Sequence, residues 1–149
     1  MLNKGMMSSN KDSWETPQDF FDKLNNKYHF SFDLAASDDN HKVDYYYTTK
    51  DDSLSKPWHK IAGNLWLNPP YGRKINDWVK KAYEESLIKN RGAIVLLIPA
   101  RTDTSYWHDY IFGKAEIKFL RGRLKFEVNG KSKYAAPFPS ALVIYEGEK

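Results

Sequence analysis

The sequence predicts an α/β fold, compact, with a mainly parallel sheet and an antiparallel C-terminal portion. Strand and helix patterns alternate from Leu65 to Leu120, the order that parallel strands joined by crossover helices require. The run from Ala93 to Ile98 is continuously apolar and rich in β-branched residues, as expected of a central strand buried on both faces. Residues 123–145 instead read as a hairpin and a closing strand, which predicts the antiparallel portion.

The composition fits a single globular domain. The 149 residues are 41% hydrophobic and 28% charged, which is ordinary for a chain with one core. We expect a flexible N-terminal tail over residues 1–12, where no periodicity occurs, and one domain over residues 13–149. The chain has no cysteine and its four histidines are scattered, so we expect no metal site. No apolar run is long enough for a bilayer and no signal core opens the chain, so we expect a cytoplasmic protein without a membrane partner.

The first helix is expected to begin next to Thr16. Thr16 is the expected N-cap, Pro17 suits the first helical position, and Asp19 would lie near the positive end of the helix. The apolar face and the end of this helix are expected at Phe20, Phe21, Leu24 and Asn25-Asn26.

Two short strands are expected after this helix. Residues 30–37 alternate and then end in small side chains, which predicts a strand followed by a tight turn. The turn carries Asp33, Ala35, Ala36 and Ser37. Its small side chains would let another group approach the backbone closely. Residues 44–49 have β-propensity and predict a second short strand, and residues 51–54 predict a turn.

The stretch Leu65–Gly72 has the most distinctive pattern. An apolar strand ends at Asn68 and meets Pro69-Pro70, which cannot continue a strand ladder and must form a stiff turn. Residues 74–89 then carry apolar side chains at helical spacing, which predicts an amphipathic helix of about four turns. The expected apolar positions are Ile75, Trp78, Val79, Ala82, Tyr83 and Leu87. The stiff turn would lie at a strand's carboxyl end, where open α/β sheets bind ligands.

The remaining elements follow from similar patterns. The buried strand should stop at Pro99, and Thr104 could cap a helix over residues 105–112. Residues 116–120 predict a strand, residues 123–134 a hairpin, and residues 141–145 a closing strand.

Basic residues are concentrated in one segment, residues 114–133. This segment holds seven basic and two acidic residues, a surplus of five against four for the whole chain. The seven are Lys114, Lys118, Arg121, Arg123, Lys125, Lys131 and Lys133. The segment is either a solvated hairpin or a surface that binds phosphates.

The stiff turn offers acceptors for an exocyclic amine. The side-chain oxygen of Asn68 and a main-chain carbonyl of Pro69 or Pro70 could accept the two N–H groups of a planar base. Accepting both hydrogens would draw the nitrogen toward a tetrahedral state with its lone pair exposed, as attack on a methyl group requires. Tyr71 could stack on the ring. The alternative is that these residues form only a rigid strand-to-helix turn.

Asn68-Pro69-Pro70-Tyr71 resembles the (Asp/Asn/Ser)-Pro-Pro-(Tyr/Phe/Trp) motif of amino-methyltransferases that use S-adenosylmethionine. The wider pattern is similar to the phage-type DNA N6-adenine methyltransferases over roughly residues 14–145. The matching elements, in order, are Trp14-Glu15-Thr16-Pro17, residues 32–37, 46–48, 52–54, 67–71, 97–103, 122–126 and 136–140. The resemblance implies a Rossmann-like methyltransferase fold, S-adenosylmethionine as cofactor and double-stranded DNA as partner, in a phage or prophage protein of a bacterial host.

Site residues follow from the resemblance by position. Asn68, Pro69, Pro70 and Tyr71 would hold the target adenine, flipped out of the duplex. The cofactor would be held by Trp14, Thr16, Pro17, Asp33, Ala35, Ala36 and Ser37, with Asp51 or Asp52 near its adenosine end. Phosphates and bases of the DNA would be contacted by Arg101, Arg121, Arg123, Lys125, Lys131 and Lys133.

The chain departs from many methyltransferases in its cofactor turn, where alanines replace glycines. It also has no insertion large enough for a separate target-recognition domain. Recognition would then come from short loops at residues 101–106 and 121–133, with a homodimer as one arrangement. Two other functions stay open from the sequence. They are methylation of a cytosine N4 or RNA adenine amine, and a basic DNA-binding module that has lost its cofactor.

Overall fold

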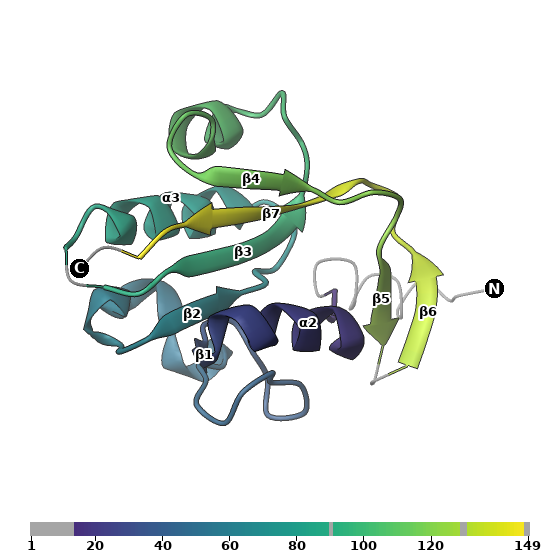
Figure 1. Ribbon diagram of the computed structural model, residues 1–149, viewed down its shortest axis with the longest axis horizontal. Coiled ribbons are helices and arrows are strands. Elements are labelled where there is room, and N and C mark those ends of the chain that lie inside the picture. Colours follow the sequence, from purple (N-terminus) through teal and green to yellow (C-terminus); the bar gives the residue numbers. More distant parts are fainter. Residues whose placement is uncertain (1–13, 90, 129–130, 148–149) are drawn as a thin grey trace.

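A five-stranded sheet forms the centre of the structure (Figure 1), a computed structural model that describes residues 14–89, 91–128 and 131–147, without the side chains of residues 132–134. Across the sheet, the strands are β1 (Phe30–Asp33), β2 (Asn64–Leu67), β3 (Ile94–Pro99), β7 (Ser140–Tyr145) and β4 (Glu116–Phe119). β1, β2 and β3 pair in parallel, whereas β7 lies antiparallel between β3 and β4. The predicted α/β fold with a mainly parallel sheet is therefore confirmed.

The core is centred on β3 and β7. All six residues of each strand are buried, and the two strands pair without a register shift from Ile94↔Tyr145 to Pro99↔Ser140. The predicted end of the apolar run is nearly right, because Pro99 is the last residue of β3. Proline is tolerated there because the strand needs no further ladder bond from that residue.

Among the described residues, α2 (Gln18–Tyr28) lies in front of the sheet and α3 (Ile75–Ser86) behind it in Figure 1. The ring of Phe21 on α2 packs against Trp66 of β2 and Phe30 of β1 at centroid distances of 5.3 and 5.6 Å. α3 confirms the predicted amphipathic helix, although Leu87 lies just past its end and is 63% exposed.

The predicted ends of α2 are wrong. Pro17 takes the N-cap position without a side-chain cap bond, because the hydroxyl of Thr16 accepts a hydrogen bond from Asn68 instead. The helix continues past Asn25-Asn26 to Tyr28 and ends at His29, whose φ of 50° is left-handed. Asn25 still contributes to the turn, since its side chain accepts from the amide of Phe30 at 2.7 Å.

The strand predicted at residues 44–49 does not form. Only a single parallel bridge joins Tyr46 to Asp33 in the described part of this segment, and the chain then turns into η1 (Thr49–Asp51). The cause is a capping box: the Thr48 hydroxyl accepts from the amide of Lys50 at 3.2 Å, and the Asp51 carboxylate accepts from the amide of Thr48 at 2.8 Å. These bonds curl the chain away from the sheet edge. Two more 3₁₀ turns follow, η2 (Ser53–Ser55) and η3 (Trp58–Lys60).

The helix predicted at residues 105–112 is mostly a π-helix, η4 (Trp107–Ile111). Thr104 does not cap it, because its hydroxyl donates to the carbonyl of Arg101 at 2.7 Å. Within the described residues, no helix combines the length and apolarity needed to cross a membrane.

The predicted hairpin forms a separate two-stranded sheet of β5 (Lys125–Val128) and β6 (Lys131–Ala135). Its predicted turn at residues 129–130 lies outside the described residues, as does the predicted tail over residues 1–12. In Figure 1 the hairpin stands beside the N-terminal end of α2, away from the five-stranded sheet. A bridge between Glu15 and Glu127 joins it to the segment that precedes α2.

Candidate functional site

A cavity of about 470 Å³ lies where β1 and β2 end and their following turns begin. Its size falls in the range of small-molecule sites, about 300–1,000 Å³. The described residues that line it are Trp14, Glu15, Leu34, Ala35, Ala36, Ser37, Asn40, Thr48, Thr49, Asp52, Ser53, Leu54, Asn68, Pro69, Pro70, Lys74 and Trp78. The carboxyl ends of parallel strands are the usual ligand site of an open α/β sheet, and the cavity lies there.

Eight of the residues predicted from the sequence line this cavity together. They are Trp14, Ala35, Ala36, Ser37 and Asp52 of the residues predicted to hold the cofactor, and Asn68, Pro69 and Pro70 of those predicted to hold the target adenine. Thr16, Pro17, Asp33, Asp51 and Tyr71 are described residues outside that lining. The cofactor turn and the Asn-Pro-Pro turn therefore share one cavity, although they are more than 30 residues apart in the chain.

The turn after β1 has used its own amide groups. The amides of Ala35, Ala36 and Ser37 donate to the Asp33 carboxylate, the Tyr47 carbonyl and the Asn40 carbonyl. Such a turn differs from a glycine-rich loop that points free amides at an anion. Ala35, Ala36 and Ser37 line the cavity, and the Ser37 hydroxyl accepts from the amide of Asn40 at 3.0 Å, so alanine is compatible with this turn.

Asp33 is the residue that holds the turn in place. Its two carboxylate oxygens accept from the amides of Ala35 at 3.3 Å and Lys42 at 3.0 Å, and the residue is 3% exposed. Burial raises the pKa of the Asp33 carboxyl above its ordinary 3.8, while these two backbone hydrogen bonds oppose the rise. Asp33 lies behind the cavity wall and braces it.

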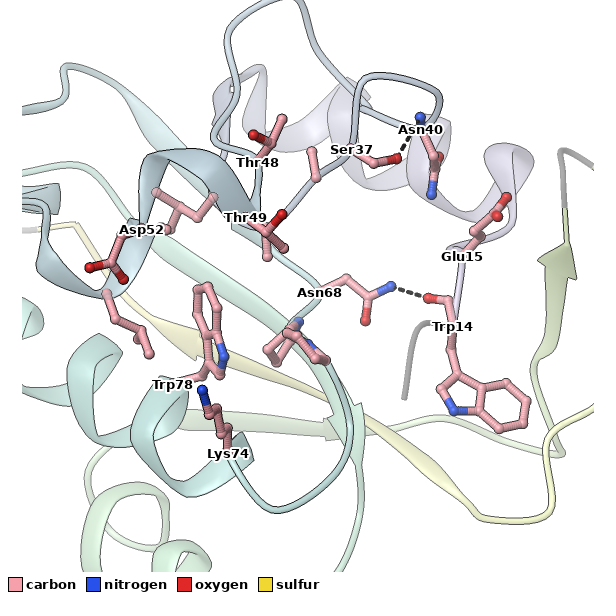
Figure 2. Close-up of a pocket in the computed structure, with 17 residues that line it drawn as sticks. Trp14, Glu15, Ser37, Asn40, Thr48, Thr49, Asp52, Asn68, Lys74 and Trp78 are labelled. Atoms are coloured by element: carbon pink, nitrogen blue, oxygen red, sulfur yellow. Dashed lines mark hydrogen bonds between the residues drawn. The ribbon is translucent and has the colours of Figure 1, made fainter. Parts of the chain in front are cut away.

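The two adjacent acids, Asp51 and Asp52, have different surroundings. The Asp51 carboxylate accepts from the amide of Thr48 at 2.8 Å and completes the capping box of η1. Asp52, with a left-handed φ of 53°, lines the cavity. In Figure 2 its carboxylate lies at the end of the cavity opposite Trp14.

Asn68 lies between these two ends of the cavity (Figure 2). Its side-chain nitrogen donates to the carbonyl of Trp14 at 2.5 Å and to the hydroxyl of Thr16 at 2.9 Å. Its side-chain oxygen Oδ1 is buried and has no hydrogen-bond partner among the described residues. An unpaired buried acceptor is costly, so this atom calls for a donor that the described residues do not supply.

Tyr71 is buried, in contrast to the exposed stacking ring expected from the sequence. It is 6% exposed, and its hydroxyl donates to the carbonyl of Leu97 on β3 at 2.8 Å. Its ring lies edge-to-face with Phe126 and Phe138. Burial raises the pKa of the Tyr71 hydroxyl well above 10, so the phenol stays protonated and anchors the turn to the sheet.

Several lining residues were not predicted. Trp78 and Lys74 reach the cavity from the start of α3, and Thr48 and Thr49 from the segment around η1. The Trp78 ring stacks on buried Trp58 at a centroid distance of 6.1 Å. In the sequence, Trp78 stands out only by its position on the apolar face of the predicted helix. Such a position does not distinguish a core residue from one that lines a cavity.

The predicted DNA-contacting residues lie in two parts of the chain, after β3 and around the hairpin. Arg101 is exposed and its guanidinium lies 5.7 Å from the ring centroid of Phe138. Arg121, Arg123, Lys125 and Lys131 are exposed along and before the hairpin, and the side chain of Lys133 lies outside the described part. Lys118 lies instead on β4 of the main sheet, so the basic segment divides between two places.

These features define the class of site. A cavity at a strand end, an unpaired acceptor in its wall and a rigid proline turn suit a small organic cofactor together with a donor group. Within the described residues, no cluster of three or more His, Cys, Asp or Glu side chains could hold a metal ion. The structure is an α/β domain with a cavity at the carboxyl ends of β1 and β2, and Asn68 in its lining carries an unpaired acceptor.

Comparison with known proteins identifies the family. Residues 4–147 match the family DNA N-6-adenine-methyltransferase (Dam), and the chain belongs to it. The family predicted from the sequence is thereby confirmed. The chain is 31% identical over 121 residues to a DNA N-6-adenine-methyltransferase of Escherichia phage T1, with 80% of this chain and 49% of the relative covered.

A second relative is matched along most of its length. It is a DNA N-6-adenine-methyltransferase of Haemophilus phage HP1 (strain HP1c1), 26% identical over 151 residues, with 98% of this chain and 85% of the relative covered. The chain therefore spans about half of the phage T1 relative and most of the phage HP1 relative.

Proposed function

We propose that this chain transfers a methyl group from S-adenosylmethionine to the N6 amine of adenine in double-stranded DNA. The observation that carries the proposal is the buried, unpaired Oδ1 of Asn68, a residue that lines the cavity. An adenine N6 amine offers N–H donors and no positive charge, which suits a neutral carboxamide oxygen. Family membership supports the same reaction.

The cavity residues suit the parts of the cofactor. The Asp52 carboxylate could accept from ribose hydroxyls, and the Trp78 ring offers an apolar surface for a purine. Ala35, Ala36 and Ser37 would lie along the methionine part, which would need its charged groups paired by side chains because the turn's amides are engaged. A Rossmann-like assignment of the sheet agrees with this arrangement.

The chain's own groups act on the amine. When bound, the cofactor supplies an electrophilic methyl group on a sulfonium sulfur, which keeps the electron pair of the broken carbon–sulfur bond. Asn68 Oδ1 and the carbonyl of Pro69 or Pro70 would accept hydrogen bonds from the two N6–H groups. The nitrogen lone pair would then be free to attack the methyl carbon. The nitrogen then releases one proton to solvent, so neither acceptor needs to hold a charge.

Tyr71 would act differently from the stacking role expected of it. In its buried position it holds the proline turn against β3 through the Leu97 carbonyl. The turn is then rigid before substrate arrives, which lowers the cost of orienting the amine. The exposed basic residues of the hairpin would meet the DNA backbone, and the adenine would leave the duplex to reach the cavity.

The test is transfer of labelled methyl groups to unmethylated DNA, followed by digestion to nucleosides. We expect label in N6-methyl-2′-deoxyadenosine from the wild type, and a loss of about 100-fold or more in kcat for Asn68→Ala, the usual effect of deleting a preorganised polar contact to the reacting group. Asn76→Ala, an exposed position on α3 outside the cavity lining, is the matched control. Label in N4-methylcytosine, or equal labelling by Asn68→Ala, would contradict the proposal.

A further inference from the structure

We infer that Thr16 is a positioning residue: with the carbonyl of Trp14, its hydroxyl holds the carboxamide of Asn68 so that Oδ1 is presented to the target amine. The inference rests on the proposed function. It concerns a residue that the sequence assigned first to a helix cap and then to the cofactor; in the structure Thr16 does not cap α2 and lies outside the cavity lining.

The contacts of Asn68 decide which way its carboxamide points. The Trp14 carbonyl can only accept, so it selects the Nδ2 end of the carboxamide and would repel Oδ1. The Thr16 hydroxyl, 2.9 Å from the same nitrogen, takes the second hydrogen. Both hydrogens of Nδ2 are then engaged. A half-turn of the carboxamide would set Oδ1 against the Trp14 carbonyl, although the Thr16 hydroxyl could rotate and donate to it, so the Trp14 carbonyl sets the direction and the Thr16 hydroxyl adds the second bond that holds it.

The same two bonds explain the unpaired oxygen. With Nδ2 fixed, Oδ1 must point away from the Trp14–Thr16 segment, and it is left buried without a partner among the described residues. A carboxamide free to turn would instead bury its oxygen against a donor, since an unpaired acceptor is unfavourable. The structure thus keeps an acceptor vacant at the cost of some stability, which is typical of a group reserved for a ligand.

Thr16 is well placed to be rigid. It is 1% exposed, and the two residues before it are held by other elements. The Trp14 ring lies edge-to-face with Phe126 at 5.5 Å and with Phe138 at 5.3 Å. The carbonyl of Glu15 accepts from the amide of Glu127 on β5 at 2.9 Å. A hydroxyl on such a segment can fix its neighbour's orientation to within a small angle.

Three variants test the inference. Thr16→Val keeps the volume and shape but removes the acceptor, Thr16→Ser keeps the hydroxyl, and Ser86→Ala removes a buried hydroxyl at the far end of α3. We expect kcat for methyl transfer to fall about 10- to 100-fold in Thr16→Val, the usual effect of misplacing a reacting group, with the KM for cofactor unchanged. Thr16→Ser should recover most of the kcat, and Ser86→Ala should keep all of it.

A second readout does not depend on activity. The side-chain NH₂ resonances of Asn68, assigned by their disappearance in Asn68→Ala, report directly on the two hydrogen bonds. We expect slow hydrogen exchange of both protons in the wild type and in Thr16→Ser, and faster exchange with a shifted resonance in Thr16→Val. This measurement tests the positioning of Asn68 even if the wild type transfers no methyl group, an outcome that would instead reject the proposed function.

Three results would overturn the inference. The first is unchanged Asn68 NH₂ resonances in a folded Thr16→Val variant. The second is an unchanged kcat in Thr16→Val when the wild type is active. The third is a loss of cofactor affinity that matches the loss of kcat and is not restored by Thr16→Ser, which would make Thr16 a cofactor contact or a purely structural residue.

Discussion

Glu15 and Glu127 face each other across an antiparallel bridge, in which the amide of Glu127 donates to the carbonyl of Glu15 at 2.9 Å. The bridge joins the hairpin to the segment that bonds Asn68 through Trp14 and Thr16. Phe126, the neighbour of Glu127, lies edge-to-face with both Trp14 and Tyr71. The element expected to meet DNA and the turn expected to hold the target amine are thus parts of one packed cluster.

Loss of Phe126 should therefore destabilise the protein strongly. Phe126 is 2% exposed, so Phe126→Ala leaves a cavity among aromatic rings and should lower the free energy of unfolding by about 3–5 kcal/mol. Phe119→Ala is the matched control, because Phe119 is 62% exposed on β4 and should cost less than about 1 kcal/mol. Denaturant unfolding followed by tryptophan fluorescence measures both. Equal losses for the two variants would show that the hairpin contributes little to the core.

Removal of a hairpin cation should change how DNA binding responds to salt. Lys125 is exposed on β5, and if it neutralises one phosphate, Lys125→Ala should make the slope of log K against log salt about one unit shallower. Lys118→Ala removes an equally exposed lysine from β4, outside the hairpin, and should leave the slope unchanged. The measurement is fluorescence anisotropy with a labelled duplex at several salt concentrations. Equal slopes for wild type and Lys125→Ala would place the DNA elsewhere.

Substitution of Asp52 should weaken cofactor binding, whereas substitution of Asp51 should lower the stability of the fold. Asp52→Asn should weaken cofactor binding about tenfold or more, since a hydrogen bond to a charged group is worth about 1.5–3 kcal/mol. Asp51→Ala removes the capping contact to the Thr48 amide and should lower the free energy of unfolding by about 0.5–2 kcal/mol. Calorimetric titration with cofactor and thermal unfolding of both variants check this pair. The reverse assignment of the two effects would make Asp51 the cofactor ligand.

The sequence predicted the parts of this structure that depend on local pattern. The apolar run at residues 93–98 can be satisfied only by burial on both faces, and it became β3. Pro69 and Pro70 have no amide hydrogen and a fixed φ, so they cannot continue a strand. The position of the stiff turn after β2 was therefore also predictable. The clustering of Ala35, Ala36 and Asn68 in one cavity follows from parallel pairing of β1 and β2.

The sequence did not predict the features in which a residue or segment can interact with either of two alternative partners. Thr16 could bond either the helix end or Asn68, and only the folded chain decides in favour of Asn68. Residues 44–49 have β-propensity, but the capping box of η1 turns the chain away after a single bridge. Tyr71 could face a ligand or the core, and the burial of its ring between Phe126 and Phe138 arises from elements more than 50 residues away.

Stability should depend on pH through Asp33. Burial raises the pKa of this carboxyl above 3.8, so the native state binds its proton more tightly than the unfolded state does. The stability gained from that proton is fully present below pH 3.8 and is lost as pH rises through the raised pKa, after which it stays constant. Asp33→Asn cannot titrate and should lack this decline, so the difference in unfolding free energy between wild type and variant should change with pH over that interval alone. Measurements of urea unfolding test it over roughly pH 3.5 to 8, from below the ordinary pKa of the carboxyl into the range where proteins are usually most stable. A difference that grows in favour of the wild type as pH rises would mean that the two backbone hydrogen bonds, from Ala35 and Lys42, outweigh burial.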